Sequence, residues 1–214
     1  MSAAISGPRP PAQTTGDGVW ARLPSNALLL EPGRFDVNSL IVPDCFGLLL
    51  LDGLITAQLE MGRAQVAWLL GADDLIRPWE MDDLTLTRQS RWEALTRTTV
   101  LPVAGELGER AARNPEIVQK LLSRAARTSH WLLAKSLILS APSIEERLLL
   151  LFALYGERWG KVTPRGIRID LPLTHQLLAN LCGARRPTVS LALQSLAKQG
   201  FLARVSRDSW LLMQ

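Results

Sequence analysis

The chain has 214 residues, of which 47% are hydrophobic, so it can bury the core of one large or two small domains and is not disordered throughout. It has two cysteines, far apart in the sequence, and two histidines, which excludes a clustered zinc or iron–sulfur site, and we expect no metal and no cofactor. The net charge of +4 is unevenly distributed: residues 25–104 hold 11 acidic and 6 basic residues (net −5), whereas residues 161–214 hold 8 basic and 2 acidic residues (net +6), which predicts an anionic partner for the C-terminal part.

Residues 1–24 contain Pro, Gly, Ser and Thr but lack the apolar segment of a signal peptide, so we expect a disordered leader. The most apolar runs of the chain, GLLLLDGLI and LLLLFALY, are too short to span a bilayer. We therefore expect a cytoplasmic protein with two reduced thiols and no membrane partner.

Residues 25–104 alternate short apolar runs with turn signals such as Pro32-Gly33, Asp52-Gly53 and Gly71. This spacing is typical of the strands of an all-β domain. The stretch ITAQLEMGRAQVAWLL predicts a hairpin around Met61-Gly62, and we expect a small β-barrel or roll.

Residues 105–140 have one strong breaker, Pro115, and Asn114-Pro115-Glu116 is a good helix start with a capping side chain and a carboxylate in the first turn. After it, apolar and small residues recur in alternating steps of four and three: Val118, Leu122, Ala125, Ser129, Leu132, Ser136 and Leu139. This seam favours a dimerising helix. A helix that packs on its own domain shows the same stripe, so both interpretations remain open at this point.

The segment Ala141-Pro142-Ser143 ends that helix and starts another, SIEERLLLLFALYGERWG, in which Ser143 and Glu146 match a capping box. A turn at Pro164-Arg165-Gly166 and a short strand, IRIDL, follow.

The stretch LPLTHQLLANLCGARRPTVSLALQSLAKQG predicts two helices separated by a break at Gly183. Thr174 can cap the first helix, and the second begins near Arg186, with Pro187 in its first turn. The expected inward stripe of the second helix is Val189, Leu193 and Leu196, with Ala192 and Ala197 beside it. Such a pair is a helix-turn-helix, whose second helix enters the major groove of DNA.

The exposed start of the second helix carries Arg185, Arg186, Thr188 and Ser190. An arginine there can donate two hydrogen bonds to guanine O6 and N7, and hydroxyls can reach bases or phosphates. Beyond Gly200, FLARVSRDSWLLM predicts a strand, a turn and a strand, which is a wing. Arg204 and Arg207 on this wing are candidate phosphate contacts.

The C-terminal part, residues 143–212, resembles the Crp/Fnr family of transcription factors (catabolite activator and anaerobic regulator). The segments SIEERLLLLFALYGERWG, TPRGIRIDLPLTHQLLANLCGA and RRPTVSLALQSLAKQGFL carry the resemblance. It implies an α+β fold. The implied domains are a leader at 1–24, a double-stranded β-helix (a cyclic-nucleotide-binding-like β-roll) at 25–104, a connecting and dimerisation helix at 105–140, and a winged helix-turn-helix at 141–214.

The resemblance also implies a transcriptional regulator that binds double-stranded DNA at a palindromic operator, with RNA polymerase as a candidate partner. It implies a homodimer held by the central helix, here through Val118, Leu122, Ala125, Leu132 and Leu139. Arg186 falls at the position of the family's main guanine-reading arginine, and Thr174 and His175 match its phosphate-contacting start of the first helix. Pro187 replaces a base-reading glutamate and Leu191 replaces a polar contact of some members, so no operator sequence can be carried over.

Family members that bind cyclic nucleotides carry a Gly-Glu-Leu-type turn followed by an arginine and a small residue. Here the corresponding stretch is GADDLIRPWEMDD, whose carboxylates, Asp73 and Asp74 among them, would repel a phosphate. We therefore expect no cyclic-nucleotide binding. Arg77, Trp79 and Glu80 combine charge with aromatic surface and are candidates for the site of an unknown small-molecule effector.

Three alternatives compete with a ligand-controlled regulator. The roll can be a degenerate scaffold beneath a ligand-independent DNA-binding protein, or the chain can be a protein-binding adaptor. An enzyme is not expected, since the sequence has no Ser-His-Asp set, no H-x-H metal pair and no glycine-rich nucleotide loop, and we assign no catalytic residue.

Overall fold

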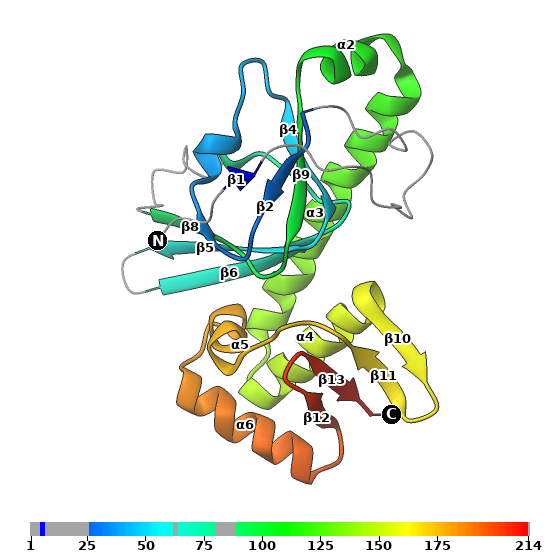
Figure 1. The fold of residues 1–214 in the computed structure, drawn as a ribbon. Helices are drawn as coiled ribbons and strands as arrows, with labels where there is room; N and C mark the ends of the chain where they lie inside the picture. The colour runs from blue at the N-terminus through cyan, green and yellow to red at the C-terminus, as the bar shows by residue number, and fades with distance from the viewer. Residues whose placement is uncertain (1–4, 7–25, 62–63, 80–88, 214) are drawn as a thin grey trace. The chain divides into compact units, whose positions relative to one another are not determined.

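The computed structural model describes residues 5–6, 26–61, 64–79 and 89–213 (Figure 1). The chain divides into two compact units, one made of residues 1–63 and 68–131 and the other of residues 64–67 and 132–214. Each unit is described by itself.

The first unit contains two sheets of short strands, as the recurring turn signals predict. One sheet has the order β1-β2-β9-β4-β7, with β1 (Ile5–Ser6), β2 (Leu28–Leu30), β9 (Thr98–Val103), β4 (Gly47–Asp52) and β7 (Leu75–Ile76). The other has the order β3-β8-β5-β6, with β3 (Gly33–Phe35), β8 (Gln89–Ala94), β5 (Leu54–Met61) and β6 (Ala64–Gly71). A 3₁₀ turn, η1 (Val37–Leu40), follows β3. Strands β5 and β6 are neighbours, as the predicted hairpin requires, and residues 62–63 of its turn lie outside the described residues.

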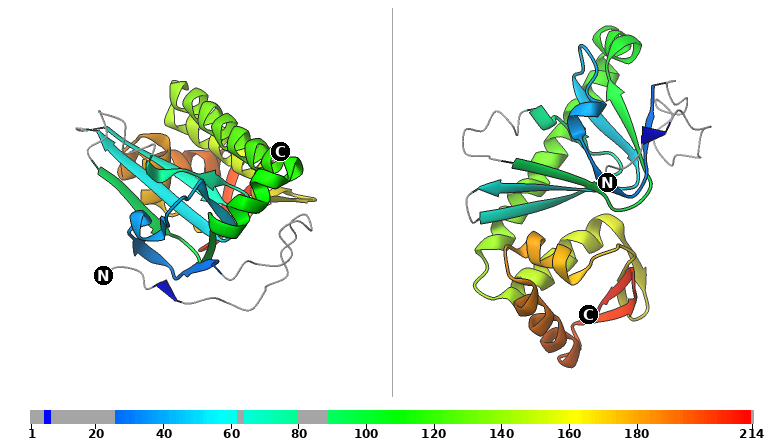
Figure 2. Two further views of the ribbon diagram at one scale, coloured as in Figure 1. Left: turned by 90° about the horizontal axis from the view of Figure 1, so that it is seen from above. Right: turned by 60° about the vertical axis from the view of Figure 1, so that its left-hand side comes forward.

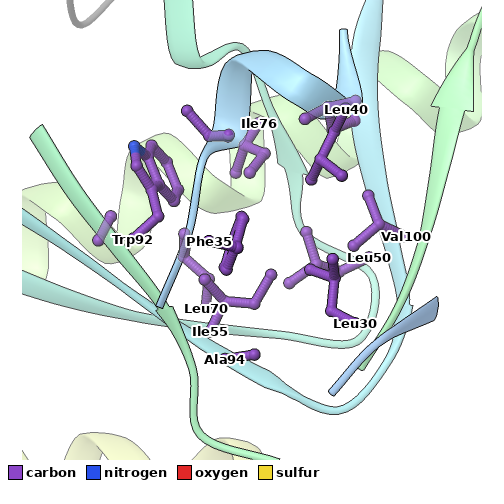
Figure 3. Close-up of a cluster of buried hydrophobic side chains, with 13 residues drawn as sticks. Leu30, Phe35, Leu40, Leu50, Ile55, Leu70, Ile76, Trp92, Ala94 and Val100 are labelled. Atoms are coloured by element: carbon purple, nitrogen blue, oxygen red, sulfur yellow. The ribbon is translucent and has the colours of Figure 1, made fainter. Parts of the chain in front are cut away.

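Apolar side chains fill the interior of this roll. Figure 3 shows side chains from the strands and from η1 converging on one cluster, in which Leu30, Leu50 and Ile55 are at most 1% exposed. Its buried members are Leu30, Phe35, Val37, Leu40, Leu48, Leu50, Ile55, Ala57, Leu70, Ile76, Trp92, Ala94 and Val100. The strands are apolar on the side that faces this cluster, which explains the sequence pattern that predicts them.

Two residues of the expected leader are placed in a strand. Ile5 and Ser6 form β1 and pair antiparallel with Leu30 and Leu29 of β2, whose outer edge offers backbone groups for pairing. Disorder of the leader at 1–24 stays a prediction. Residues 1–4 and 7–24 of the expected leader lie outside the described residues.

Two helices follow the roll, α2 (Gly105–Arg113) and α3 (Pro115–Ser140). The break between them is the predicted helix start: Asn114 Oδ1 accepts a hydrogen bond from the Glu116 N–H at 3.0 Å. Ile117 and Leu121 of α3 are buried against strand residues in a second cluster of the first unit. The first turns of α3 up to Trp131 belong to the first unit and the remainder to the second.

The second unit contains three further helices and a four-stranded sheet of order β10-β11-β13-β12 (Figure 2). The helices are α4 (Ile144–Trp159), α5 (His175–Cys182) and α6 (Arg186–Lys198), and the strands are β10 (Gly160–Thr163), β11 (Gly166–Ile169), β12 (Leu202–Ser206) and β13 (Ser209–Leu212). Ser143 caps α4, and its hydroxyl accepts a hydrogen bond from the Glu146 N–H at 3.1 Å. Within the described ranges, none of the helices combines the length and hydropathy needed to cross a bilayer.

Candidate nucleic-acid interface

The helix-turn-helix of α5 and α6 is built by local signals. The Thr174 hydroxyl accepts a hydrogen bond from the Leu177 N–H at 3.1 Å and so caps α5. Gly183 ends α5 in the left-handed conformation, with φ +61° and ψ +39°, which a residue with a side chain adopts only with strain. The next helix begins at Arg186 with Pro187 in its first turn. These caps and breaks are the ones that the sequence predicts.

The inner face of α6 packs against the rest of the second unit. Val189, Ala192, Leu193 and Leu196 are buried, as predicted. Ala197 is exposed, whereas Ala192, at a similar angle on the other side of the stripe, is buried. Of the two alanines expected beside the stripe, Ala192 alone is covered.

The outer start of α6 is exposed and basic. Arg185, Arg186, Pro187 and Thr188 are all exposed, and the Arg185 side chain makes no capping hydrogen bond. From residue 183 to residue 207 the sequence has five basic residues and no acidic residue. A helix N-terminus with such flanking charges attracts phosphate.

Ser190 is placed differently from its neighbours. It is half-buried, and its hydroxyl lies 2.9 Å from Nδ1 of His175, which joins the first turns of α5 and α6. Burial of the imidazole, together with the charges of Arg204 and Arg186, lowers the pKa of His175 below its usual 6.5. His175 is therefore neutral at neutral pH. Four of the predicted DNA contacts thus lie close enough to influence one another.

The wing is the β12–β13 hairpin, with Arg207 exposed at its tip. The guanidinium of Arg204 lies 5.3 Å from the ring centroid of Trp210 and donates to the carbonyls of Ser206 and Arg207 at 3.2 and 2.9 Å. Trp210 is buried, and its ring centroid lies 5.1 Å from that of Phe152 and 6.4 Å from that of His175. Sequence reasoning missed Trp210 as a supporting residue, and its position in a short alternating strand is the signal that could have indicated it.

The exposed apolar line of α3 differs from the predicted seam. Val118 and Leu122 are 39% and 59% exposed, whereas Ala125, Leu132 and Leu139 are half-buried. Leu133 and Leu137, which the seam omitted, are 64% and 73% exposed. The difference arises because the prediction used alternating steps of four and three, whereas the exposed residues of the second half follow a line shifted by one position.

The expected effector residues lie on the first unit. Arg77 is exposed, and its guanidinium carbon lies 5.4 Å from the ring centroid of Phe46 and 5.5 Å from that of Trp79. Glu80 lies outside the described residues.

The carboxylates that precede Arg77 have specific partners on α3, which sequence reasoning missed. Asp73 Oδ1 accepts hydrogen bonds from Nε and Nη2 of Arg124 at 3.1 and 2.6 Å. Asp74 is 1% exposed, and its carboxylate accepts hydrogen bonds from the Gly71 N–H at 2.8 Å and from the Thr128 hydroxyl at 3.3 Å. No local pattern reveals the pairs with Arg124 and Thr128, because these two partners are more than 50 residues from Asp73 and Asp74 in sequence.

Within the described residues, no group of three or more His, Cys, Asp or Glu side chains is arranged to hold a metal ion. Cys182 is fully buried at the end of α5, and burial raises the pKa of its thiol to about 12. Near it, burial lowers the pKa of Lys135 to about 8.

Comparisons with known proteins show which domain family and which solved structures the chain resembles. Residues 146–213 match the Crp-like helix-turn-helix domain. Among curated proteins, no match is found.

Solved structures share the fold of most of the chain. A mutant of CooA from Carboxydothermus hydrogenoformans is 20% identical, with a TM-score of 0.67 over 88% of this chain and 83% of that chain. A CRP/FNR-family transcriptional regulator from Thermus thermophilus is 15% identical, with a TM-score of 0.61 over 88% and 93%. The c-di-GMP-responsive global regulator CLP of Xanthomonas campestris is 16% identical, with a TM-score of 0.62 over 88% and 93%. The predicted fold class and the resemblance to Crp/Fnr regulators are confirmed.

Proposed function

We propose that this chain, with its Crp-like helix-turn-helix domain and the fold of CRP/FNR-type DNA-binding regulators, is a homodimeric, sequence-specific transcriptional regulator. The observation that carries the proposal is the exposed start of α6, where Arg185 and Arg186 stand beside a helix N-terminus in a stretch free of acidic residues. This arrangement suits the major groove, where an arginine can donate two hydrogen bonds to a guanine.

The proposed contacts divide into residues that contact bases and residues that contact phosphates. Arg186 reads a guanine, and Arg185 and Thr188 contact bases or phosphates near it. Thr174 and His175, at the start of α5, and Arg204 and Arg207, on the wing, lie near the phosphates. Ser190 keeps α5 and α6 in register through its hydrogen bond to His175 and is the most recessed member of the set.

The proposed dimer uses the exposed apolar line of α3. Leu122, Leu133 and Leu137 are each more than half exposed, and a second α3 can cover them. Val118 and Ala125 extend this line, and the half-buried Leu132 and Leu139 lie at its border. A two-fold dimer presents two copies of α6, which requires an operator with two inverted half-sites.

The proposal has two versions, which differ in whether an effector controls DNA binding. In the first, an effector other than a cyclic nucleotide binds at Arg77 and Trp79, next to Glu80 in the sequence. In the second, the protein binds DNA without an effector, and its amount sets its activity. The second version is favoured by the contacts of Asp73 and Asp74 with α3, because these carboxylates bond to groups of the chain itself. Contact with RNA polymerase, a cytoplasmic location and the absence of catalysis belong to the same proposal.

The decisive experiment is selection of genomic fragments by the purified full chain at several stated salt concentrations, because non-specific binding falls steeply with salt. We expect recovery of an inverted repeat that survives the higher salt. Failure to retain any fragment at low salt would contradict the proposal and favour a protein-binding adaptor. Repeating the selection with cyclic nucleotides present tests the exclusion of that ligand class, since unchanged binding agrees with both effector versions and altered binding contradicts both.

A further inference from the structure

The exposed face of α6 carries two apolar side chains amid its positive charge. Leu191 is 67% exposed, and Pro187, one helical turn before it, is exposed as well. Residues four apart on a helix are neighbours, so the two form one apolar strip. The strip begins directly beside Arg186, and the opposite face of the helix is buried through Val189 and Leu193. It is therefore presented on the exposed face of α6, at the same end of the helix as the proposed guanine-reading arginine.

We propose that Pro187 and Leu191 read thymine through its 5-methyl group, so that each half-site has a thymine next to the guanine contacted by Arg186. This inference rests on the proposed function. It commits to DNA as the occupant because the strip lies in a stretch with five basic and no acidic residues, which suits a phosphate backbone on both sides.

The chemistry of the major groove leaves few alternatives for an apolar side chain. The thymine 5-methyl is the largest apolar group that base edges present there, since cytosine offers only a C5–H, and most other positions are hydrogen-bond donors and acceptors. A leucine placed against a donor or acceptor would remove its water without replacing the hydrogen bond, which is unfavourable. Leu191 therefore favours a T·A pair by attraction and disfavours other pairs by desolvation.

The test uses the inverted repeat recovered by selection and replaces one thymine at a time by deoxyuridine, which removes only the methyl group. Binding to the full chain is measured by competition at fixed salt. We expect one thymine position in each half-site to be sensitive, with a loss of about fourfold per methyl, equivalent to about 0.8 kcal/mol. Replacing both symmetric thymines should cost about fifteenfold, since the two losses multiply.

Variants assign the effect to the strip. Leu191→Ala should bind the thymine and deoxyuridine operators with nearly equal affinity, and Pro187→Ala should reduce the discrimination in part. Val162→Ala, at an 88% exposed position of β10, is the matched control and should keep the full discrimination. If the wild-type chain binds its operator but no deoxyuridine matters, or if Leu191→Ala still discriminates fully, the inference is wrong while the proposed function stands. If no fragment is recovered at all, the proposed function itself fails.

Discussion

Arg124 donates hydrogen bonds from both Nε and Nη2 to a single carboxylate oxygen of Asp73. Arg124 lies in α3 and is 8% exposed, whereas Asp73 lies in the turn after β6 with φ +71°. Arg127 adds a hydrogen bond to the Asp73 backbone carbonyl at 2.9 Å. Within the first unit, the turn between β6 and β7 is thus fastened to α3 by charge-assisted bonds, which are among the stronger hydrogen bonds of proteins.

Asp73→Asn should destabilise the first unit. The amide keeps the shape of the side chain and tolerates a positive φ, but it removes the negative charge that faces the buried Arg124 guanidinium. We expect a loss of about 1–3 kcal/mol in the free energy of unfolding, measured by urea titration, since the carboxylate is half exposed. Asp44→Asn is the control, because Asp44 also has a positive φ, +56°, and is exposed. Equal stability of the two variants would contradict the role assigned to Asp73.

Arg186→Ala should weaken sequence preference more than total DNA affinity. Loss of a bidentate contact with guanine reduces the free energy of binding by about 1–3 kcal/mol on the preferred operator and by little on other sequences. Competition between operator and random DNA measures both quantities. Arg207→Ala, at the tip of the wing, should instead weaken binding to all sequences alike. A uniform loss for Arg186→Ala would remove its base-reading role.

Leu122→Glu combined with Leu133→Glu should convert the proposed dimer into monomers, because each chain would bury two charges in an apolar interface. Light scattering should report the mass of one chain, and operator binding should fall. Leu150→Glu, at a 43% exposed position of α4, controls for the introduction of a charge in place of a leucine. A dimer that persists in the double variant would show that the exposed line of α3 is not the interface.

Stability should decrease as the pH falls below about 6.5, through His175. Its pKa is lowered in the folded state by burial and by the nearby arginines, so the unfolded chain binds the proton first, and the lost stability levels off below the folded pKa. His175→Asn, which keeps a polar atom near Ser190, should lose this part of the pH profile in thermal unfolding from about pH 7.5 to about pH 5. His130→Asn, at an exposed position of α3, controls for removal of a histidine. Identical profiles for His175→Asn and wild type would count against this assignment.

Lys135→Met should stabilise the second unit at neutral pH. Lys135 is 6% exposed, and burial lowers its pKa from 10.5 to about 8, which corresponds to about 3 kcal/mol of cost for holding the charged amine there. The advantage of the methionine variant should shrink as the pH rises from about 8 towards about 10, because the folded chain then releases the proton before the unfolded chain does. Urea titrations at about pH 7, 8 and 9.5 give this difference. An advantage that does not change with pH would point to packing instead of charge.

The helix-turn-helix was predictable because its signals are local. The Thr174 cap, the left-handed Gly183 and Pro187 in the first turn each act over a few residues, and the structure has all three where the sequence indicates them. The same holds for Asn114 at the start of α3. Such positions depend little on the rest of the fold.

The remaining features depend on distant parts of the chain. In the sequence, Asp73 and Asp74 indicate only carboxylates that would repel a phosphate. The folded chain brings Arg124 and Thr128 next to them. Leu132 and Leu133 differ in exposure because of what packs against each side of α3, which periodicity alone does not specify. Ser190 likewise acquires its histidine partner through the packing of two helices.

Contacts within the chain hold the conformation of the hairpin that carries Arg207. Arg204 donates hydrogen bonds to the carbonyls of Ser206 and Arg207, and its guanidinium lies over the ring of Trp210. The chain therefore loses the freedom of this loop when it folds and not when it docks. Under the proposed function, binding to DNA immobilises fewer torsions, and the proposed phosphate contacts should give a longer-lived complex than a flexible loop would allow.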